Sequence, residues 1–458
     1  MGKLGHRRST LAQVCTRRKL LLGAALPLLA LSACGDESNE RHFAGDPRTV
    51  QPDGNATEPG TGTGPAEASP TAVATVMSAG DLLDPRGTQA IAVVPLRHDL
   101  VAIDSESGSG TTIWQNPERS IWAAKADPAS EFAAILTSER NAAADWTVEF
   151  VPIAGGEAVS VRVGEGSGGD GHRPDSVAGG RGGLDWLPDS SSIALSLPTG
   201  GLMQVYRDGS KVRLAKASAA KRPAEVAVTV DGSAIAYIEQ PSGSEGTGIY
   251  AGSLRAKPID PIVVLPADRS GNRYARQVGW IGASDRIATI LEREELGRPQ
   301  GDLFVIDTQS KVPHLAWTSP AGRDIASVES FAVSDDGLVT AFVTNPTSSG
   351  ATKPSSVWVK QTDGPAIERF DLPVQLSDSR LSYAPNGLLV SGITGRTDEE
   401  DGFAAAFLLE PNGVVSLVYQ QVPAATPVAS PQGSPVASPL ASPQASPVGS
   451  PSPVSSPT

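Results

Sequence analysis

Short apolar runs in which Ile or Val alternates with small residues recur along the chain, and a turn precedes each of them. The turns are built from Pro, Asp, Asn, Ser and Gly, which are the residues that punctuate β-structure. Runs of four to eight such residues between turns are typical of strands rather than helices. The seven copies lie at 90–94, 132–136, 193–197, 235–238, 287–290, 339–342 and 388–390.

A second hairpin follows several of these copies. Asp208-Gly209, Asp363-Gly364 and Asn412-Gly413 each follow a strand-like run, and such pairs are the strongest short hairpin signals. Two hairpins per repeat make a four-stranded sheet, and the spacing of roughly 40 to 60 residues is that of propeller blades. We therefore predict an all-β chain forming a seven-bladed β-propeller, with six or eight blades as alternatives. The Ile-Ala runs should be the inner strands, buried on both faces.

The turns also resemble the repeats of a known family. Trp186-Leu187-Pro188-Asp189 and Ala384-Pro385-Asn386-Gly387 are similar to the Trp-Ser-Pro-Asp-Gly repeats of TolB-like (WD40-like) propellers. The resemblance covers about residues 75–420 and implies the architecture rather than a function. No Trp-Asp dipeptide closes a repeat, so the chain departs from the WD40 pattern proper.

The amino terminus has the pattern of an export signal. Arg17 and Arg18 precede an apolar run that is too short to span a bilayer as a helix. Leu31-Ser32-Ala33-Cys34 resembles the lipobox of bacterial lipoproteins. The resemblance implies that residues 1–33 are a signal peptide and that Cys34 carries acyl chains such as palmitate. Arg17 and Arg18 leave export by the general or the twin-arginine route open.

Composition divides the rest of the chain. Residues 34–72 are predicted to be a flexible linker, 73–421 the propeller, and 422–458 a disordered tail rich in Pro, Ser and Ala. With a lipid anchor at Cys34, the propeller is expected outside the cytoplasm, tethered to the cell membrane within the cell envelope.

Charge and metal-binding residues exclude several functions. The net charge is −13 and becomes about −19 without residues 1–33, which disfavours nucleic acid. Both cysteines, Cys15 and Cys34, precede the predicted propeller, so no thiolate metal site is expected there. The histidines that follow residue 33 are not spaced as metal ligands are, so we expect neither a metal nor a cofactor. These histidines are His42, His98, His172 and His314.

Catalytic motifs are also missing. There is no Gly-x-Ser-x-Gly elbow, and residues 164–169 match a dinucleotide pattern without a following helix. We expect no catalytic residue and no enzyme, because the ring leaves no polypeptide for a catalytic module. The leading hypothesis is a monomeric binding or scaffold module for a protein or glycan partner.

Two alternatives stay open. A propeller lyase or hydrolase would need several carboxylates to converge with a His or Arg in the central funnel. Residues 102–108 and 305–310, followed by Trp114 and Trp317, resemble the tryptophan-docking repeat of quinoprotein-type propellers. That resemblance implies a propeller in envelope protein assembly.

Overall fold

A computed structural model describes residues 77–139, 142–165, 183–197, 201–215, 221–241, 247–266, 273–295, 298–319, 326–346, 353–395 and 402–421. These residues belong to one compact unit, Ala72–Thr458. The predicted signal peptide, the linker and the tail lie outside the described residues, as does Cys34. The only described helix is α1 (Ala79–Leu82), and nothing in the described part has the length and apolarity of a membrane-spanning helix.

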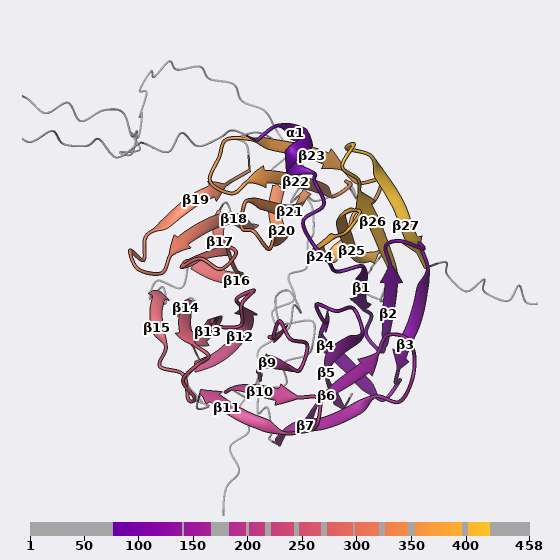
Figure 1. Ribbon diagram of the computed structural model, residues 1–458, viewed down its shortest axis with the longest axis vertical. Helices are drawn as coiled ribbons and strands as arrows, with labels where there is room; N and C mark the ends of the chain where they lie inside the picture. Colours follow the sequence, from indigo (N-terminus) through magenta and orange to yellow (C-terminus); the bar gives the residue numbers. More distant parts are fainter. Residues whose placement is uncertain are drawn as a thin grey trace, which may run out of the picture. The chain divides into compact units, whose positions relative to one another are not determined.

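Seven antiparallel sheets form a ring, as predicted (Figure 1). Six sheets have four strands each and the first has three. The blades, in chain order, are β1 (Ile91–Pro95), β2 (Asp99–Asp104), β3 (Gly110–Gln115); β4 (Arg119–Ala126), β5 (Phe132–Glu139), β6 (Ala142–Pro152), β7 (Val159–Glu165); β8 (Leu184–Trp186), β9 (Ser192–Ser196), β10 (Leu202–Tyr206), β11 (Lys211–Ala215); β12 (Lys221–Val228), β13 (Ala234–Pro241), β14 (Gly248–Ser253), β15 (Ile262–Leu265); β16 (Arg273–Trp280), β17 (Arg286–Glu295), β18 (Arg298–Asp307), β19 (Pro313–Trp317); β20 (Ala326–Val333), β21 (Val339–Pro346), β22 (Ser356–Gln361), β23 (Ile367–Asp371); and β24 (Ser377–Ala384), β25 (Gly387–Thr394), β26 (Phe403–Leu409), β27 (Val415–Gln420).

All seven apolar runs are strands, but their place in the blade differs from the prediction. In the four-stranded sheets they are the second strands, whereas the innermost strands come before the turns. Every residue of β25 is buried, as is every residue of β9. A second strand has a strand on each side and a blade on each face, so it shows the strongest apolar pattern.

The first blade has no innermost strand among the described residues. In five of the six complete blades the register shifts between the third and fourth strands, and in the first blade it shifts between β2 and β3. The β1–β2 pairing has no shift. Hence β3 is an outermost strand and β1 a second strand, and no described strand occupies the innermost place.

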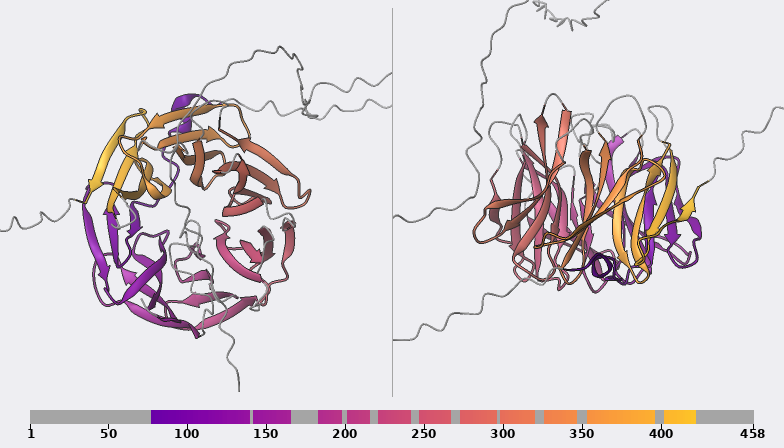
Figure 2. Two further views of the ribbon diagram at one scale, coloured as in Figure 1. Left: turned by 180° about the vertical axis from the view of Figure 1, so that it is seen from behind. Right: turned by 90° about the horizontal axis from the view of Figure 1, so that it is seen from above.

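The amino-terminal segment helps to close the ring. Leu82 is 1% exposed and Leu83 8% exposed, and both pack in a cluster contributed mainly by the sixth and seventh blades. Arg86 then forms an ion pair with Asp336 of the sixth blade, with 2.5 Å between Nη1 and Oδ2. A Cβ at Gly87 would overlap the carbonyl of Tyr383, so glycine is required where the chain passes β24. Figures 1 and 2 show α1 near β22 and β23, on the far side of β24 from β1.

Contacts made by side chains join each described innermost strand to the next and form a closed belt. Because no innermost strand of the first blade is described, the last contact runs directly from β24 to β4. In ring order they are Lys125 Nζ to Asp185 Oδ1 (2.5 Å), Val228 N to Asp185 Oδ2 (2.8 Å), Trp280 Nε1 to the Ala227 carbonyl (3.1 Å), Gln277 Nε2 to the Phe331 carbonyl (2.9 Å), Ser330 Oγ to Ser379 Oγ (2.9 Å), and Arg380 Nη1 to the Ala124 carbonyl.

Candidate functional site

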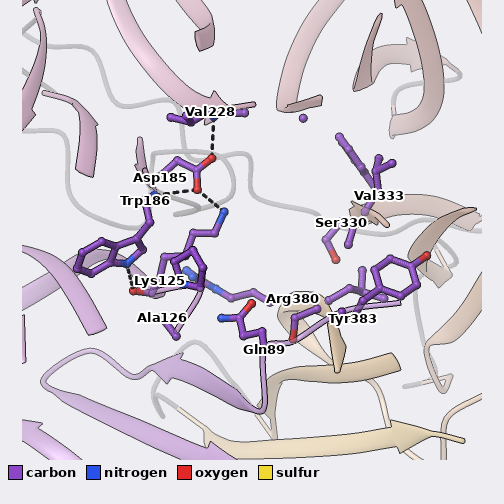
Figure 3. Close-up of a pocket in the computed structure, with 18 of the residues that line it drawn as sticks. Gln89, Lys125, Ala126, Asp185, Trp186, Val228, Ser330, Val333, Arg380 and Tyr383 are labelled. Carbon is purple, nitrogen blue, oxygen red and sulfur yellow. Dashed lines mark hydrogen bonds and ion pairs between the residues drawn. The ribbon is translucent and has the colours of Figure 1, made fainter. Parts of the chain in front are cut away.

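The inside of the ring contains a cavity of about 470 Å³. Its wall is formed mainly by the innermost strands and the turns that follow them, and the first blade contributes Ala92 and Val93 of β1, so all seven blades line the cavity. One side is lined by Ala227, Gly279 and Ala332, while Lys125 and Asp185 occupy the equivalent strand positions on the other side. Figure 3 shows the Lys125–Asp185 pair at the wall of this cavity.

Lys125 and Asp185 form an ion pair between two blades. The distance from Nζ to Oδ1 is 2.5 Å, and the lysine side chain is 47% exposed against 11% for the aspartate. Asp185 is fixed by two further bonds, because Oδ1 accepts from the backbone N–H of Trp186 and Oδ2 from that of Val228. The carboxylate is therefore an orienting group, and the ammonium is the part that a ligand can reach.

Arg380 is the second cation of the cavity wall. It extends from β24 and donates to the Ala124 carbonyl on β4. Figure 3 shows its side chain beside Gln89, from the segment that leads into β1. Two cations and an amide therefore lie around the place that the missing innermost strand leaves.

Asp335 is the charged residue among the turn positions that line the cavity. The backbone bond that closes this turn, from Ser334 N to the Val339 carbonyl, aligns Asp335 with Pro128, Pro188 and Val230 of other blades. Asp336, and not Asp335, holds the turn, since its Oδ1 accepts from Ser334 Oγ and from Leu338 N. The turn therefore has no need of an acid at 335.

The surroundings of Asp335 change its acidity. Although the residue as a whole is exposed, burial of its carboxyl group raises the pKa, and the neighbouring charge of Asp336 raises it further. A carboxyl with a raised pKa keeps its proton to higher pH than an ordinary aspartate does. That property suits a group that gives or takes a proton during a reaction.

Other segments singled out in the sequence have structural roles where they are described. Trp317 packs between blades, with ring centroids 5.0 Å from Phe342 and 5.5 Å from Trp358. Gly164, the first residue of the dinucleotide-like segment, is part of β7. Arg17, Arg18, Leu31, Ser32, Ala33 and Cys34 lie outside the described residues.

Comparison with known proteins identifies the fold and no family. No family model matches the chain, and no match among curated proteins was found. An oligogalacturonate lyase in complex with manganese is similar in structure, with 14% identity and a TM-score of 0.50, over 73% of this chain and 86% of that one. The oligogalacturonate lyase of Vibrio parahaemolyticus is also similar, with 10% identity and a TM-score of 0.48, over 72% of this chain and 86% of that one. A puromycin hydrolase is similar with 12% identity and a TM-score of 0.49, over 77% of this chain and 56% of that one.

This similarity corrects the expectation that the chain is not an enzyme. We expected no enzyme because the ring leaves no polypeptide for a catalytic module. The oligogalacturonate lyase is matched over 86% of its length, so a propeller of this fold is by itself nearly a whole enzyme. The argument from missing polypeptide is therefore wrong, and the expectation that the chain is not an enzyme is corrected.

The manganese of that lyase does not fit the described residues of this chain. No group of three His, Cys, Asp or Glu side chains among them could hold a metal ion. His98 contacts the carbonyl of Arg119, and His314 lies on β19, an outermost strand. We derive no chemical step through a metal.

Proposed function

We propose that this chain is an extracytoplasmic propeller enzyme of the lyase or hydrolase class that acts on an anionic saccharide in the central cavity. The observation that supports this is the group of cavity residues formed by Lys125 on its Asp185 support, Arg380, and Asp335 with its raised pKa. Carboxylates and an arginine line the same cavity, and this combination is what the enzyme alternative required. Oligogalacturonate, on which the similar lyase acts by its name, is the first substrate class to test.

The chemistry of each cavity side chain suggests its role in the reaction. Lys125 and Arg380 neutralise an anionic group of the substrate and orient it. Asp335 donates a proton to the leaving oxygen as the C–O bond breaks, which both β-elimination and hydrolysis require, and a second group accepts the proton lost from the sugar carbon or from the attacking water. The net charge of the chain repels polyanions, so the cavity cations have to supply the attraction at short range.

Replacing Lys125 with alanine should weaken substrate binding. We expect kcat/KM for an oligogalacturonate series to fall about tenfold to a hundredfold, since a hydrogen bond to a charged group contributes roughly 1.5–3 kcal/mol. The measurement is initial rate against substrate concentration, with unsaturated products and new reducing ends followed separately.

Lys211→Ala is the matched control for that variant. Lys211 lies on β11 and donates to the carbonyl of Arg162, away from the cavity. Equal rates for Lys125→Ala and the unchanged chain would contradict the proposed site. Absence of turnover across a panel of uronic, sulfated and phosphorylated saccharides would contradict the activity itself.

We further propose that the enzyme is anchored to the membrane through Cys34. The lipobox-like Leu31-Ser32-Ala33-Cys34 supports this, and two or three acyl chains give stable anchoring where one is marginal. Cys34→Ser should move the protein from the membrane fraction to the soluble fraction, with Cys15→Ser as the control. Mass spectrometry of a mature chain without acyl chains on Cys34 would contradict the anchor.

A binding module for a protein partner is the second candidate function. The innermost place of the first blade favours it, because no described strand pairs with the sheet edge there.

A further inference from the structure

We propose that the channel-side edge of β1 binds an extended segment of a partner polypeptide, which takes the place of the missing innermost strand of the first blade. The proposal does not rest on the enzymatic function, because its main ligand groups are the backbone N–H and C=O groups of β1, although Lys125 and Arg380 take part in both proposals. In the other six blades a strand of this chain fills that place.

The backbone of β1 presents hydrogen-bonding groups at this edge. Ser105 N donates to the Ala90 carbonyl and Leu96 N to the Asp99 carbonyl, so even-numbered residues of this segment pair with β2. In an antiparallel pair the residues between them point their N–H and C=O groups the other way. Ile91 and Val93 therefore direct theirs toward the channel, where no described strand pairs with them.

The presence of Pro95 in β1 is consistent with a strand edge that no described strand of this chain pairs with. It has the same parity as Ile91 and Val93 in β1, and proline has no N–H to donate. Within sheets proline is confined to positions without a ladder partner. It also limits the bound segment, because only Ile91 and Val93 offer both a donor and an acceptor.

The cavity extends into the innermost place of the first blade, which no described strand occupies. From the first blade, Gly87, Thr88 and Gln89 line the cavity, together with Ala92 and Val93 of β1. β1 corresponds to the second strand of the other blades. In the other blades mainly innermost strands line it, and the exception, Ser391 of β25, belongs to the blade beside the vacancy. The wall is thus set back by about one strand spacing, roughly 4.8 Å.

The chemistry around this edge favours a polypeptide with an acidic side chain. A polypeptide supplies alternating N–H and C=O groups at the period that Ile91 and Val93 require, as in other cases of strand addition, whereas a saccharide does not. Lys125 on β4 and Arg380 on β24 belong to the two blades that flank the vacancy. A carboxylate near the middle of the bound segment would complement both cations.

The test uses the mature full chain and a defined probe. The probe is a capped octapeptide of alternating Val and Thr with one central Asp, and its control has the same sequence with every second residue N-methylated. Amide hydrogen exchange is measured residue by residue. We expect the probe to slow exchange at Ile91 and Val93 at least tenfold, and the N-methylated peptide to slow it at neither.

A backbone variant tests the same edge from the protein side. Val93→Pro removes one channel-side donor and should weaken probe binding at least tenfold, while Val93→Thr keeps the donor and should bind as the unchanged chain does. Should Val93→Pro fail to fold, the N-methylated control still decides. Binding without protection of Ile91 and Val93, absence of binding at millimolar probe, or protection by trigalacturonate and not by the peptide would each overturn the proposal.

Discussion

Replacing Leu82 with alanine is expected to lower the free energy of unfolding of the propeller by about 2 to 5 kcal/mol, the cost of a leucine truncated in a packed core. Leu82 is 1% exposed and packs with Val339, Val357 and Phe407, which come from the sixth and seventh blades. Urea denaturation at constant m-value measures the loss.

Leu338→Ala is the matched control, because Leu338 is 54% exposed in a turn of the sixth blade and should change stability by less than about 0.5 kcal/mol. A loss below about 1 kcal/mol for Leu82→Ala would mean that α1 rests on the ring without holding it. In that case the side-chain contacts between the innermost strands would be the main interactions that close the ring.

The strand topology explains why residues 77–90 help to close the ring. None of the described sheets combines strands from both ends of the chain, so no strand pairing ties the first blade to the last. The first blade instead packs on the seventh through Val94, Ile103, Leu389 and Ala406. Contacts of α1 on the sixth and seventh blades add a second tie across the same seam.

The number of blades could be predicted because the second strands repeat a pattern that their environment imposes. Burial on both faces allows few residue types, and Ile193-Ala194-Leu195 and Ile287-Ala288-Thr289 show the result. The innermost strands gave no such signal. One edge of each faces the cavity, and the side chains of Asp185 and Gln277 bond to the next blade, so polar residues interrupt their alternation.

The sequence pattern did not reveal that the first blade has no described innermost strand. Its turn at residues 84–87 and the run that follows look like any other copy, although the segment before them is a helix. Ser78 and Asp81 form a capping box at that helix, and such a pair is a readable helix signal. The helix is only four residues long, too short for a periodic pattern.

The cavity residues could not be assembled without the ring. Lys125, Asp185 and Arg380 come from three blades, and the sequence does not show which blades face each other across a channel. Asp335 did leave a signal, since it stands at the turn position where Pro128 and Pro188 stand in other copies. An acid that replaces a turn-forming residue without taking over its role is a candidate for function.

Asp335→Asn is accordingly expected to lower kcat by about 10²- to 10⁴-fold, the contribution of a positioned acid or base, or roughly 3 to 5 kcal/mol of transition-state stabilisation. KM should change little, because the anionic group of the substrate is held by Lys125 and Arg380. Asp208→Asn, at an exposed turn of the third blade, should leave both constants unchanged.

The pH dependence separates this role from a structural one. Burial and the charge of Asp336 raise the pKa of Asp335, so the protonated form that serves as an acid persists to higher pH than in an ordinary aspartate. If Asp335 is the acid, activity should fall as pH rises through that raised pKa, and the Asn variant should lose this limb of the profile. A variant with reduced kcat and an unchanged profile would mean that Asp335 only shapes the cavity, and the proton would then have to come from another group.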